Sequence, residues 1–470
     1  MRKDASPKGV YTQNKTAKEL QKISEQSFRG SEAWLNDRGN NMARVVVIGA
    51  GAMGLAAAYR AAKMGHQVDL LEAAPDPGGM AGHFDFGGLS LERFYHFVCL
   101  SDQPTFQLMK ELGIEDKMKW RKTTMGYFDG KLHPWGDPIS LLRYPRLTLL
   151  DKMRYGLFAY VCVRRNRWPA IEHESAKAWI TRWCGQTVYD WFWKPLFDHK
   201  FYEYADNISA AWIWTRIRRI GRSRAGILEE RLGYIEGGSI TLVNALVEGI
   251  RAHGGRVHLA TPVERITAAA GRVTGVQTAS GAFAADAVIC TAPTPMVNAL
   301  APDLPEDWKQ RYAAIHNIGV ICVIFKLGRS VTPHFWVNVS VPGIEIPGVI
   351  EFSNLREVGD DSIVYVPYYM PVTHPKFVWT DEQLLAEAFA CLQQINPRLT
   401  QADVCDTKVA RLRYGQPICE PGFAAKIPPV KTPIVGLQIA DTCYYYPEDR
   451  GIAESVRLGA AMAEAVGEAN

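Results

Sequence analysis

From residue 44 onwards the chain alternates between short apolar runs typical of buried strands and longer stretches with helical periodicity. Residues 45–48 form an uninterrupted apolar run, an alanine-rich stretch typical of a helix follows, and residues 67–71 form a second strand pattern. This order predicts a βαβ unit. The longest apolar runs elsewhere, such as residues 319–325, are too short to cross a bilayer, so we expect no membrane span.

The same patterns predict the coarse order of elements along the rest of the chain. Residues 233–266 predict a glycine-rich loop, a helix and a strand, and residues 271–293 predict a hairpin followed by a buried strand. Residues 301–410 predict strands with one helix, over residues 382–394. Residues 97–230 are rich in aromatic and basic side chains at roughly helical spacing, which predicts a mainly helical segment.

A glycine-rich motif, G-x-G-x-x-G, lies directly after the first predicted strand. Its residues are Gly49, Ala50, Gly51, Ala52, Met53 and Gly54. Gly49 permits a tight turn, Gly51 lets the backbone approach a pyrophosphate, and Gly54 lets the helix pack on the strand. The amino end of the helix supplies N–H groups and a positive dipole, and Glu72, at the end of the second strand, suits a ribose 2′-OH. The motif therefore predicts a dinucleotide site.

The residues after this acid favour FAD over NAD. The stretch APDPGGMAGHF contains a second glycine pair, Gly78 and Gly79, and small residues there let the backbone follow the diphosphate and ribityl chain of a long cofactor. Here the sequence resembles the flavin family that includes monoamine oxidases, protoporphyrinogen oxidases and phytoene desaturases. It departs from that family where the frequent arginines around the pair are replaced by Asp76 and Met80.

The resemblance implies an α/β fold with a discontinuous, Rossmann-type FAD-binding domain. A substrate domain, made of a mixed sheet and a helical insertion, would be joined to it. The expected segments are 42–96, 231–300 and 411–470 for the FAD-binding domain, 97–230 for the mainly helical insertion, and 301–410 for the sheet part of the substrate domain. The polar residues 1–41 are expected to form a disordered extension.

The resemblance also implies which residues bind the cofactor. Val263 would lie against adenine, Thr291 ends the strand that returns to the Rossmann sheet, and Asp441 would bond the ribityl hydroxyls. Gly451 and Ile452 would begin a final helix whose amino end faces the N1–C2=O edge of the flavin. The complete expected set is Gly49, Ala50, Gly51, Ala52, Met53, Gly54, Glu72, Ala73, Gly78, Gly79, Met80, Val263, Thr291, Asp441, Gly451 and Ile452.

The catalytic residues are not assigned by any motif, and His96 and Tyr446 are the candidates. Amine oxidases of the family place a lysine near flavin N5; the aligned position falls near Val320, and Lys326 would point elsewhere. This favours a desaturase or dehydrogenase over a simple amine oxidase. Cys443 is interpreted as a free apolar residue, so FAD is expected to be held non-covalently.

These expectations define two hypotheses about function. The first is an FAD-dependent oxidoreductase, of oxidase, dehydrogenase or desaturase type, that acts on a bulky, apolar or isoprenoid-like small molecule. The second is a non-redox flavoenzyme that resembles UDP-galactopyranose mutase and acts on a sugar nucleotide. The many arginines would then bind its diphosphate.

Composition narrows the partners and the compartment. A net charge of +4 over 470 residues gives no reason to expect nucleic-acid binding. Nine dispersed cysteines without a CxxC pair indicate reduced thiols in a cytoplasmic compartment and no metal site. Residues 139–168 interleave basic side chains with leucines and aromatics, which leaves open peripheral contact with a membrane, a cationic outer face, or the mouth of an anion-binding site.

Overall fold

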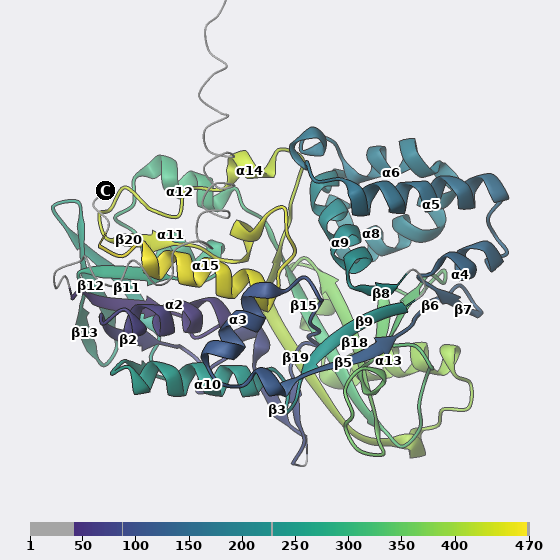
Figure 1. The fold of residues 1–470 in the computed structure, drawn as a ribbon, viewed down its shortest axis with the longest axis horizontal. Helices are drawn as coiled ribbons and strands as arrows, with labels where there is room; N and C mark the ends of the chain where they lie inside the picture. The colour runs from purple at the N-terminus through teal and green to yellow at the C-terminus, as the bar shows by residue number, and fades with distance from the viewer. Residues whose placement is uncertain (1–41, 87, 227–228, 468–470) are drawn as a thin grey trace, which may run out of the picture. The chain divides into compact units, whose positions relative to one another are not determined.

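Two sheets carry most of the β-structure of the protein (Figure 1). The computed structural model describes residues 42–86, 88–226 and 229–467, and the elements from Arg44 onward belong to one compact unit. The extension predicted over residues 1–41 lies outside the described residues. Within the described part of the chain, no helix is both long enough and apolar enough to cross a membrane.

The first sheet is wholly parallel, with the strand order β10-β2-β1-β14-β20. Its strands are β1 (Arg44–Ile48), β2 (Gln67–Leu71), β10 (Arg256–His258), β14 (Ala287–Cys290) and β20 (Leu437–Ile439). Segments far apart in the sequence are neighbours, because Val288 of β14 pairs with Val46 on one side and with Leu437 on the other. This confirms the predicted discontinuous, Rossmann-type sheet.

This sheet is covered by helices on one face and by a small antiparallel sheet on the other. Helices α2 (Ala52–Lys63), α10 (Ser239–Ala252) and α15 (Ile452–Glu464) pack together (Figure 1). Strands β11 (Val263–Ala269), β12 (Arg272–Thr278) and β13 (Gly281–Ala284) form the antiparallel sheet. Val46 and Val288 share a buried cluster with Val273 and Val276 of β12, so alternate side chains of the parallel strands point towards it.

The second sheet has seven strands in the order β19-β15-β18-β17-β16-β6-β7, with one parallel pair, β16 and β6. Its strands are β6 (Met125–Phe128), β7 (Leu132–Trp135), β15 (Asn317–Leu327), β16 (Trp336–Val339), β17 (Gly348–Glu351), β18 (Ser362–Met370) and β19 (Val404–Pro417). Strands β6 and β7 come from the segment predicted as mainly helical, and β19 continues past residue 410. Helix α13 (Asp381–Ile395), which packs on this sheet, was predicted.

The prediction of one helix in residues 301–410 is wrong, because α12 (Glu306–Ala313) precedes the sheet. The short polar sequence of α12 carries little apolar periodicity, and Tyr312 is its one buried residue. Tyr312 packs into the cluster beneath the parallel sheet and Trp308 packs against it, so tertiary contacts rather than a repeated apolar pattern fix this helix.

Residues 97–230 supply a group of helices around a core rich in aromatic side chains (Figure 1). The helices around this core are α4 (Pro138–Arg143), α5 (Leu149–Arg164), α6 (Ala176–Cys184), α7 (Gln186–Val188), α8 (Lys194–Phe201) and α9 (Ala210–Arg222), whereas α3 (Gln103–Glu111), from the same segment, packs against α15. We call this core the aromatic core; it contains Phe158, Trp179, Tyr189, Phe197, Phe201, Trp212 and Trp214 among its buried residues. Ile318, Val320 and Tyr369 of the second sheet also belong to it, so it joins the helices to that sheet.

Shorter elements complete the fold. They are β3 (His83–Asp85), β4 (Ser90–Glu92), β5 (Met118–Thr123), β8 (Arg224–Gly226), β9 (Glu229–Ile235), α11 (Val297–Leu300) and α14 (Phe423–Lys426). Strands β3 and β4 form a hairpin, and β5, β9 and β8 form an antiparallel sheet in that order.

Candidate functional site

The glycine-rich loop between β1 and α2 has the geometry of a phosphate cradle. Gly49 has φ of +97°, which only glycine adopts without strain, and Gly51 is the N-cap of α2. No side chain caps this helix, and its first turn holds no acidic residue, so its amino end is available to an anion. A Cβ at Gly51 would have no neighbour within 4 Å, whereas one at Gly54 would lie 1.8 Å from the carbonyl oxygen of Gly49.

The second glycine pair lies directly on this loop. The amide of Gly78 donates to the carbonyl of Ala50 at 2.8 Å, and a Cβ at Gly79 would come within 3.1 Å of Gly51 Cα. The two glycine motifs, separated by some two dozen residues, therefore form one surface at the amino end of α2. Met80 follows in the next turn and is half-buried.

Glu72 stands at the end of β2 and also holds the loop. Its carboxylate accepts hydrogen bonds from the amides of Ala50, at 2.6 Å, and Ala74, at 2.9 Å. A carboxylate has about four acceptor positions, so two remain for a ribose. The exposed Ala73 lies beside it. These residues, with the open space at Gly51, fit the pyrophosphate and ribose of a dinucleotide.

Val263 and Thr291 flank this site in different ways. The segment before Val263 runs beside Glu72, because the amide of Thr261 donates to the carbonyl of Glu72 at 2.7 Å. Val263 itself begins β11 and is half-buried. The hydroxyl of Thr291 donates to the carbonyl of Ile48 at 2.8 Å, so it supports the loop from below. A cofactor contact remains a prediction for both residues.

The carboxyl-terminal segment returns the chain to the same sheet. Gly451 is the N-cap of α15, which confirms the predicted start of the last helix. Asp441 is 6% exposed; its carboxylate accepts from the amide of Thr294 at 2.6 Å, from the Thr294 hydroxyl, and from the amide of Cys443 at 2.8 Å. Asp441 thus ties the loops after β14 and β20 together. Its predicted contact with ribityl hydroxyls would use the acceptor capacity that these bonds leave.

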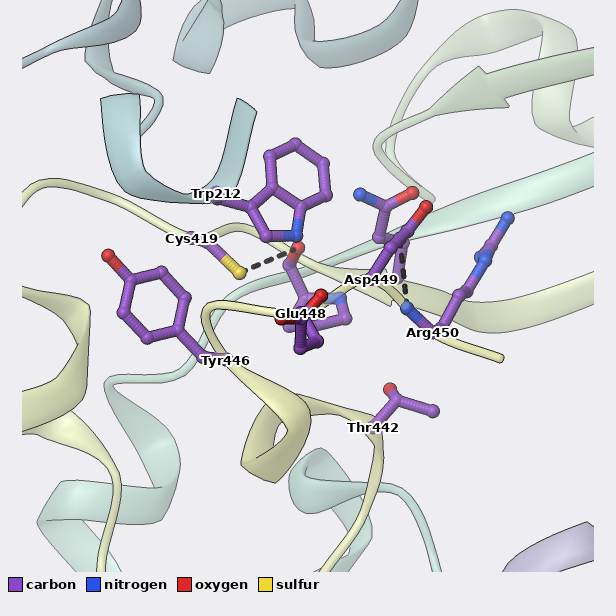
Figure 2. A pocket seen from close by; sticks show the side chains of 9 residues that line it. Trp212, Cys419, Thr442, Tyr446, Glu448, Asp449 and Arg450 are labelled. Atoms are coloured by element: carbon purple, nitrogen blue, oxygen red, sulfur yellow. Dashed lines mark hydrogen bonds between the residues drawn. The ribbon is translucent and has the colours of Figure 1, made fainter. Parts of the chain in front are cut away.

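A pocket lies between this segment and the substrate half of the protein (Figure 2). It is lined by Trp212 of α9, Gln416 and Pro417 of β19, Cys419, and five residues of the carboxyl-terminal segment: Thr442, Tyr446, Glu448, Asp449 and Arg450. Thr442 and Arg450 are the sequence neighbours of the predicted cofactor residues Asp441 and Gly451. The pocket therefore borders the predicted flavin site and the aromatic core at once.

Charged side chains surround the pocket. Arg216 stacks on Trp212, 3.8 Å from its ring centroid, and donates to Asp449 at 2.5 Å. Burial opposes ionisation of Asp449, but Arg216 and other nearby cations outweigh it and lower the pKa of this carboxyl. Burial, together with Glu454, raises the pKa of Glu448 to about 7. Adjacent carboxyls thus ionise in different pH ranges.

Of the two catalytic candidates, only Tyr446 lines the pocket. Its hydroxyl lies 2.7 Å from Ser209 Oγ and donates to Glu172 at 2.8 Å, and burial followed by the charge of Glu172 raises its pKa. Tyr446 is therefore held by two partners and walls the site. His96 is half-buried, burial lowers its pKa, and its Nδ1 is buried without a partner among the described residues. A catalytic role stays a prediction for both residues.

Two lysines bear on the comparison with amine oxidases. One is Lys326 of β15, and the other is Lys200 of α8, which is buried and which the sequence did not indicate. Lys326 pairs with Asp361 at 3.0 Å, as expected for a lysine that points elsewhere. Val320, the position aligned with the lysine of amine oxidases, pairs across the sheet with Tyr369. The Nζ of Lys200, from α8, lies 4.4 Å from the centroid of the Tyr369 ring. An amine thus approaches this part of the sheet from the helical segment instead of from β15.

Sequence signals for these additional residues are weak. Gln416 is a single polar residue near the end of a strand pattern, Arg450 ends a run of three charged residues, and Lys200 is one of many basic residues in residues 97–230. Cys443 is fully buried, and burial raises its pKa well above the usual range, so its thiol is neither exposed nor activated. This agrees with the interpretation of Cys443 as a free apolar residue.

Comparison with known proteins identifies the class. A model of the family described as flavin containing amine oxidoreductase matches residues 54–444, most of the chain, so the chain belongs to this family. A second model, described as the C-terminal domain of alanine dehydrogenase/PNT, matches residues 22–78, which include the βαβ unit. Membership of this flavin-containing oxidoreductase family confirms the predicted family and cofactor class.

Individual relatives agree with this assignment at low identity. The chain is 25% identical over 302 residues to a probable zeta-carotene desaturase of Synechococcus elongatus, across 57% of this chain and 62% of the relative. It thus spans less than two thirds of that relative's length. A putative protoporphyrinogen oxidase from Exiguobacterium sp. 255-15 superposes with a TM-score of 0.69 at 19% identity, across 91% of this chain and 99% of the other. A reduced UDP-galactopyranose mutase gives a TM-score of 0.68 at 16% identity, across 90% and 95%. At these identities the two structures establish a shared fold.

Proposed function

We propose that the protein binds FAD non-covalently and oxidises a bulky, apolar, isoprenoid-like small molecule. The observation that carries the proposal is the aromatic core, which ends in Trp212 and Tyr446 at the pocket beside the predicted flavin site. Trp212, Tyr446 and Pro417 give the pocket an apolar side, which suits an apolar part of a substrate. The carotene desaturase among its relatives supports this substrate class.

The protein's own residues would bind and orient the cofactor. The amino end of α2 and Gly51 would receive the pyrophosphate, Glu72 the ribose, and the amino end of α15 the pyrimidine edge of the ring. The flavin, when bound, supplies a two-electron acceptor for a C–H bond of the substrate. Tyr446, held by Ser209 and Glu172, would wall the site and exclude water.

The experiment is to purify the protein and follow its flavin during turnover. We expect a yellow protein whose flavin is bleached anaerobically by a polyene or related isoprenoid and restored by oxygen or a quinone. A protein that carries no flavin, or whose flavin no isoprenoid can reduce, would contradict the proposal.

A second candidate is a flavin-dependent rearrangement of a sugar nucleotide without net redox change. The guanidinium groups of Arg216 and Arg450 at the pocket favour it, because guanidinium groups suit a diphosphate. The same experiment separates the candidates. Activity that requires prior reduction of the flavin and consumes no acceptor would support the rearrangement and exclude the oxidoreductase.

We also propose that α4 and α5 contact the surface of an anionic membrane on the cytoplasmic side. Eleven large hydrophobic side chains are exposed in the described residues, and seven of them lie on these two helices, each between 44% and 67% exposed. The seven are Ile139, Leu142, Leu149, Leu150, Met153, Leu157 and Tyr160. On α5 their spacing places them on one face, and the exposed Arg143, Arg164 and Arg167 flank them.

The other face of α5 packs against the aromatic core, which relates the proposed membrane contact to the proposed substrate site. Phe158 and Cys162 belong to the aromatic core, so one helix separates the exposed apolar face from the core behind it. A lipid-soluble substrate would thus leave the bilayer next to its binding site.

Vesicle sedimentation tests the membrane proposal. We expect binding to vesicles containing phosphatidylglycerol, weaker binding to pure phosphatidylcholine, and loss of both in Met153→Asp. Val378→Asp is the matched control, because Val378 is 81% exposed but lies outside these helices. Equal sedimentation of Met153→Asp and the wild type would remove the proposal.

A further inference from the structure

Arg450 is the residue before the N-cap of α15, at the helix end that is predicted to face the flavin. Its guanidinium group is held by two uncharged oxygens: it donates to the carbonyl of Gly415 and, at 3.2 Å, to the hydroxyl of Tyr369. The hydroxyl of Tyr95 lies 3.3 Å from the same Tyr369 hydroxyl. Tyr95 belongs to the segment that follows the glycine pair, so Arg450 lies where that segment and the start of α15 both meet the second sheet.

The carboxylates around this end of α15 do not neutralise Arg450. Three of them pair with other arginines: Asp449 with Arg216 at 2.5 Å, Asp102 with Arg219 at 2.7 Å, and Glu454 with Arg457 at 2.8 Å. Burial, together with the charge of Glu454, raises the pKa of Glu448 to about 7, so this carboxyl is only partly ionised at neutral pH. Within the described part of the chain, the Arg450 side chain forms no ion pair, so positive charge remains at this place.

This positive charge lies at the unfavourable end of the helix. The amino end of a helix carries a partial positive charge, which stabilises anions and disfavours cations. A second guanidinium group is also close, because a Cβ at Gly451 would lie 3.8 Å from Arg219 Nη2. The effect extends to His96, whose pKa is lowered by burial and further by Arg450 and Arg219. A negative charge supplied by a bound group would turn this repulsion into attraction.

The proposed reaction creates such a charge. The substrate gives a hydride to the flavin and a proton to water, so the reduced flavin carries one more negative charge than the oxidised flavin. The amino end of α15 is predicted to face the N1–C2=O edge, where this charge is concentrated. A cation without a counterion stabilises the charged form of its neighbour more than the neutral form.

We propose that Arg450, together with the amino end of α15, stabilises the negative charge of the reduced flavin and so raises the reduction potential of the bound cofactor. This inference rests on the proposed flavin-dependent function and deepens it. Arg450 acts through its charge, while its bonds to Gly415 and Tyr369 keep the guanidinium group in place.

The test measures the midpoint potential of the flavin in the loaded protein at pH 7, by slow reduction with xanthine and xanthine oxidase beside a reference dye. No substrate of the protein is needed. In Arg450→Met we expect the preference for reduced over oxidised flavin to fall about 10-fold, the lower end of the effect of one neighbouring charge. For a two-electron couple this lowers the potential by about 30 mV. Arg450→Lys keeps the charge and should keep most of the wild-type potential.

Arg413→Met is the matched control, because Arg413 is an exposed arginine of β19 and the same charge is removed. Its potential should equal that of the wild type. If Arg450→Met does not fold, Arg450→Gln retains a donor for the Gly415 carbonyl and should show the same loss of potential.

Three results would overturn the inference: an unchanged potential in Arg450→Met, an equal loss in Arg450→Lys, or an equal loss in Arg413→Met. The second would assign Arg450 to packing, and the third would assign the effect to the net charge of the protein. Flavin-loaded protein that shows the expected shifts but oxidises no isoprenoid would contradict the proposed substrate and leave this role intact.

Discussion

Alanine substitutions at Gly51 and Gly54 separate cofactor binding from folding. The two glycines lie in one motif, but a Cβ at Gly51 would meet nothing within 4 Å, and a Cβ at Gly54 would lie 1.8 Å from the carbonyl oxygen of Gly49. Real Cβ contacts do not fall below 3.0 Å, so the Gly54 loop must move by more than 1 Å. A Cβ at Gly51 would instead occupy the space in which we expect the pyrophosphate of the cofactor.

The magnitudes follow from these contacts. Gly51 has φ of −70° and ψ of 173°, which alanine adopts freely. The gain of about 0.4–1 kcal/mol from a stiffer unfolded chain is offset by the poorer N-cap, so the apoprotein should change by less than about 1 kcal/mol. Gly54→Ala forces backbone against backbone and should cost about 3 kcal/mol, or about 3 °C in Tm for a chain of this size.

The assay measures two quantities on each variant: flavin per protein after desalting, and Tm of the apoprotein. We expect Gly51→Ala to retain the Tm of the wild type and to lose at least about nine tenths of its flavin, and Gly54→Ala to lose both. Wild-type flavin content in Gly51→Ala would refute the phosphate cradle. An unchanged Tm in Gly54→Ala would refute the packing argument.

Three further predictions concern single side chains. Glu448 has a pKa of about 7 against 4.5 for an ordinary glutamate, so the native state holds a proton that the unfolded chain loses between these values, and stability falls as pH rises through that window. Glu448→Gln should therefore unfold at the same denaturant concentration as the wild type near pH 5 but be more stable by up to about 3 kcal/mol at pH 8; an equal difference at both pH values would contradict the assignment. Acid precipitation should release all flavin into the supernatant from both the wild type and Cys443→Ala, whereas flavin retained in the wild-type pellet would indicate a covalent link. Asp441→Asn, which cannot accept at both oxygens from Thr294 and Cys443, should lower the free energy of unfolding by about 1.5–3 kcal/mol, and an unchanged denaturation midpoint would exclude that role.

Local patterns predicted the cofactor half of the protein closely. The strand before Gly49, the helix after Gly51 and the helix that begins at Ile452 all stand where the sequence indicated. These elements follow from apolar periodicity and from glycines required by backbone geometry, and both are properties of neighbouring residues. The resemblance to the flavin family was drawn from the same glycine motifs.

Other elements depend on contacts that no local pattern contains. Strands β6 and β7 join a sheet whose other strands begin at Asn317, nearly two hundred residues later. Helix α12 is held by Tyr312 and Trp308, which pack on a cluster beneath the parallel sheet. Asp441, which the family resemblance implies as a ribityl partner, accepts hydrogen bonds from Thr294, and only the folded sheet brings Thr294 beside it.

The sequence by itself determined the parallel sheet, the glycine-rich loop with Glu72, and the flavoprotein class. The tertiary structure alone decided the pocket, because Trp212, Gln416 and Arg450 come from three segments that meet only when the aromatic core packs against the second sheet. It alone placed Lys200 over Tyr369 and turned one face of α5 outwards. A repeated pattern in the chain encodes which face of an element is buried, but the partner across that face is set by packing between distant elements.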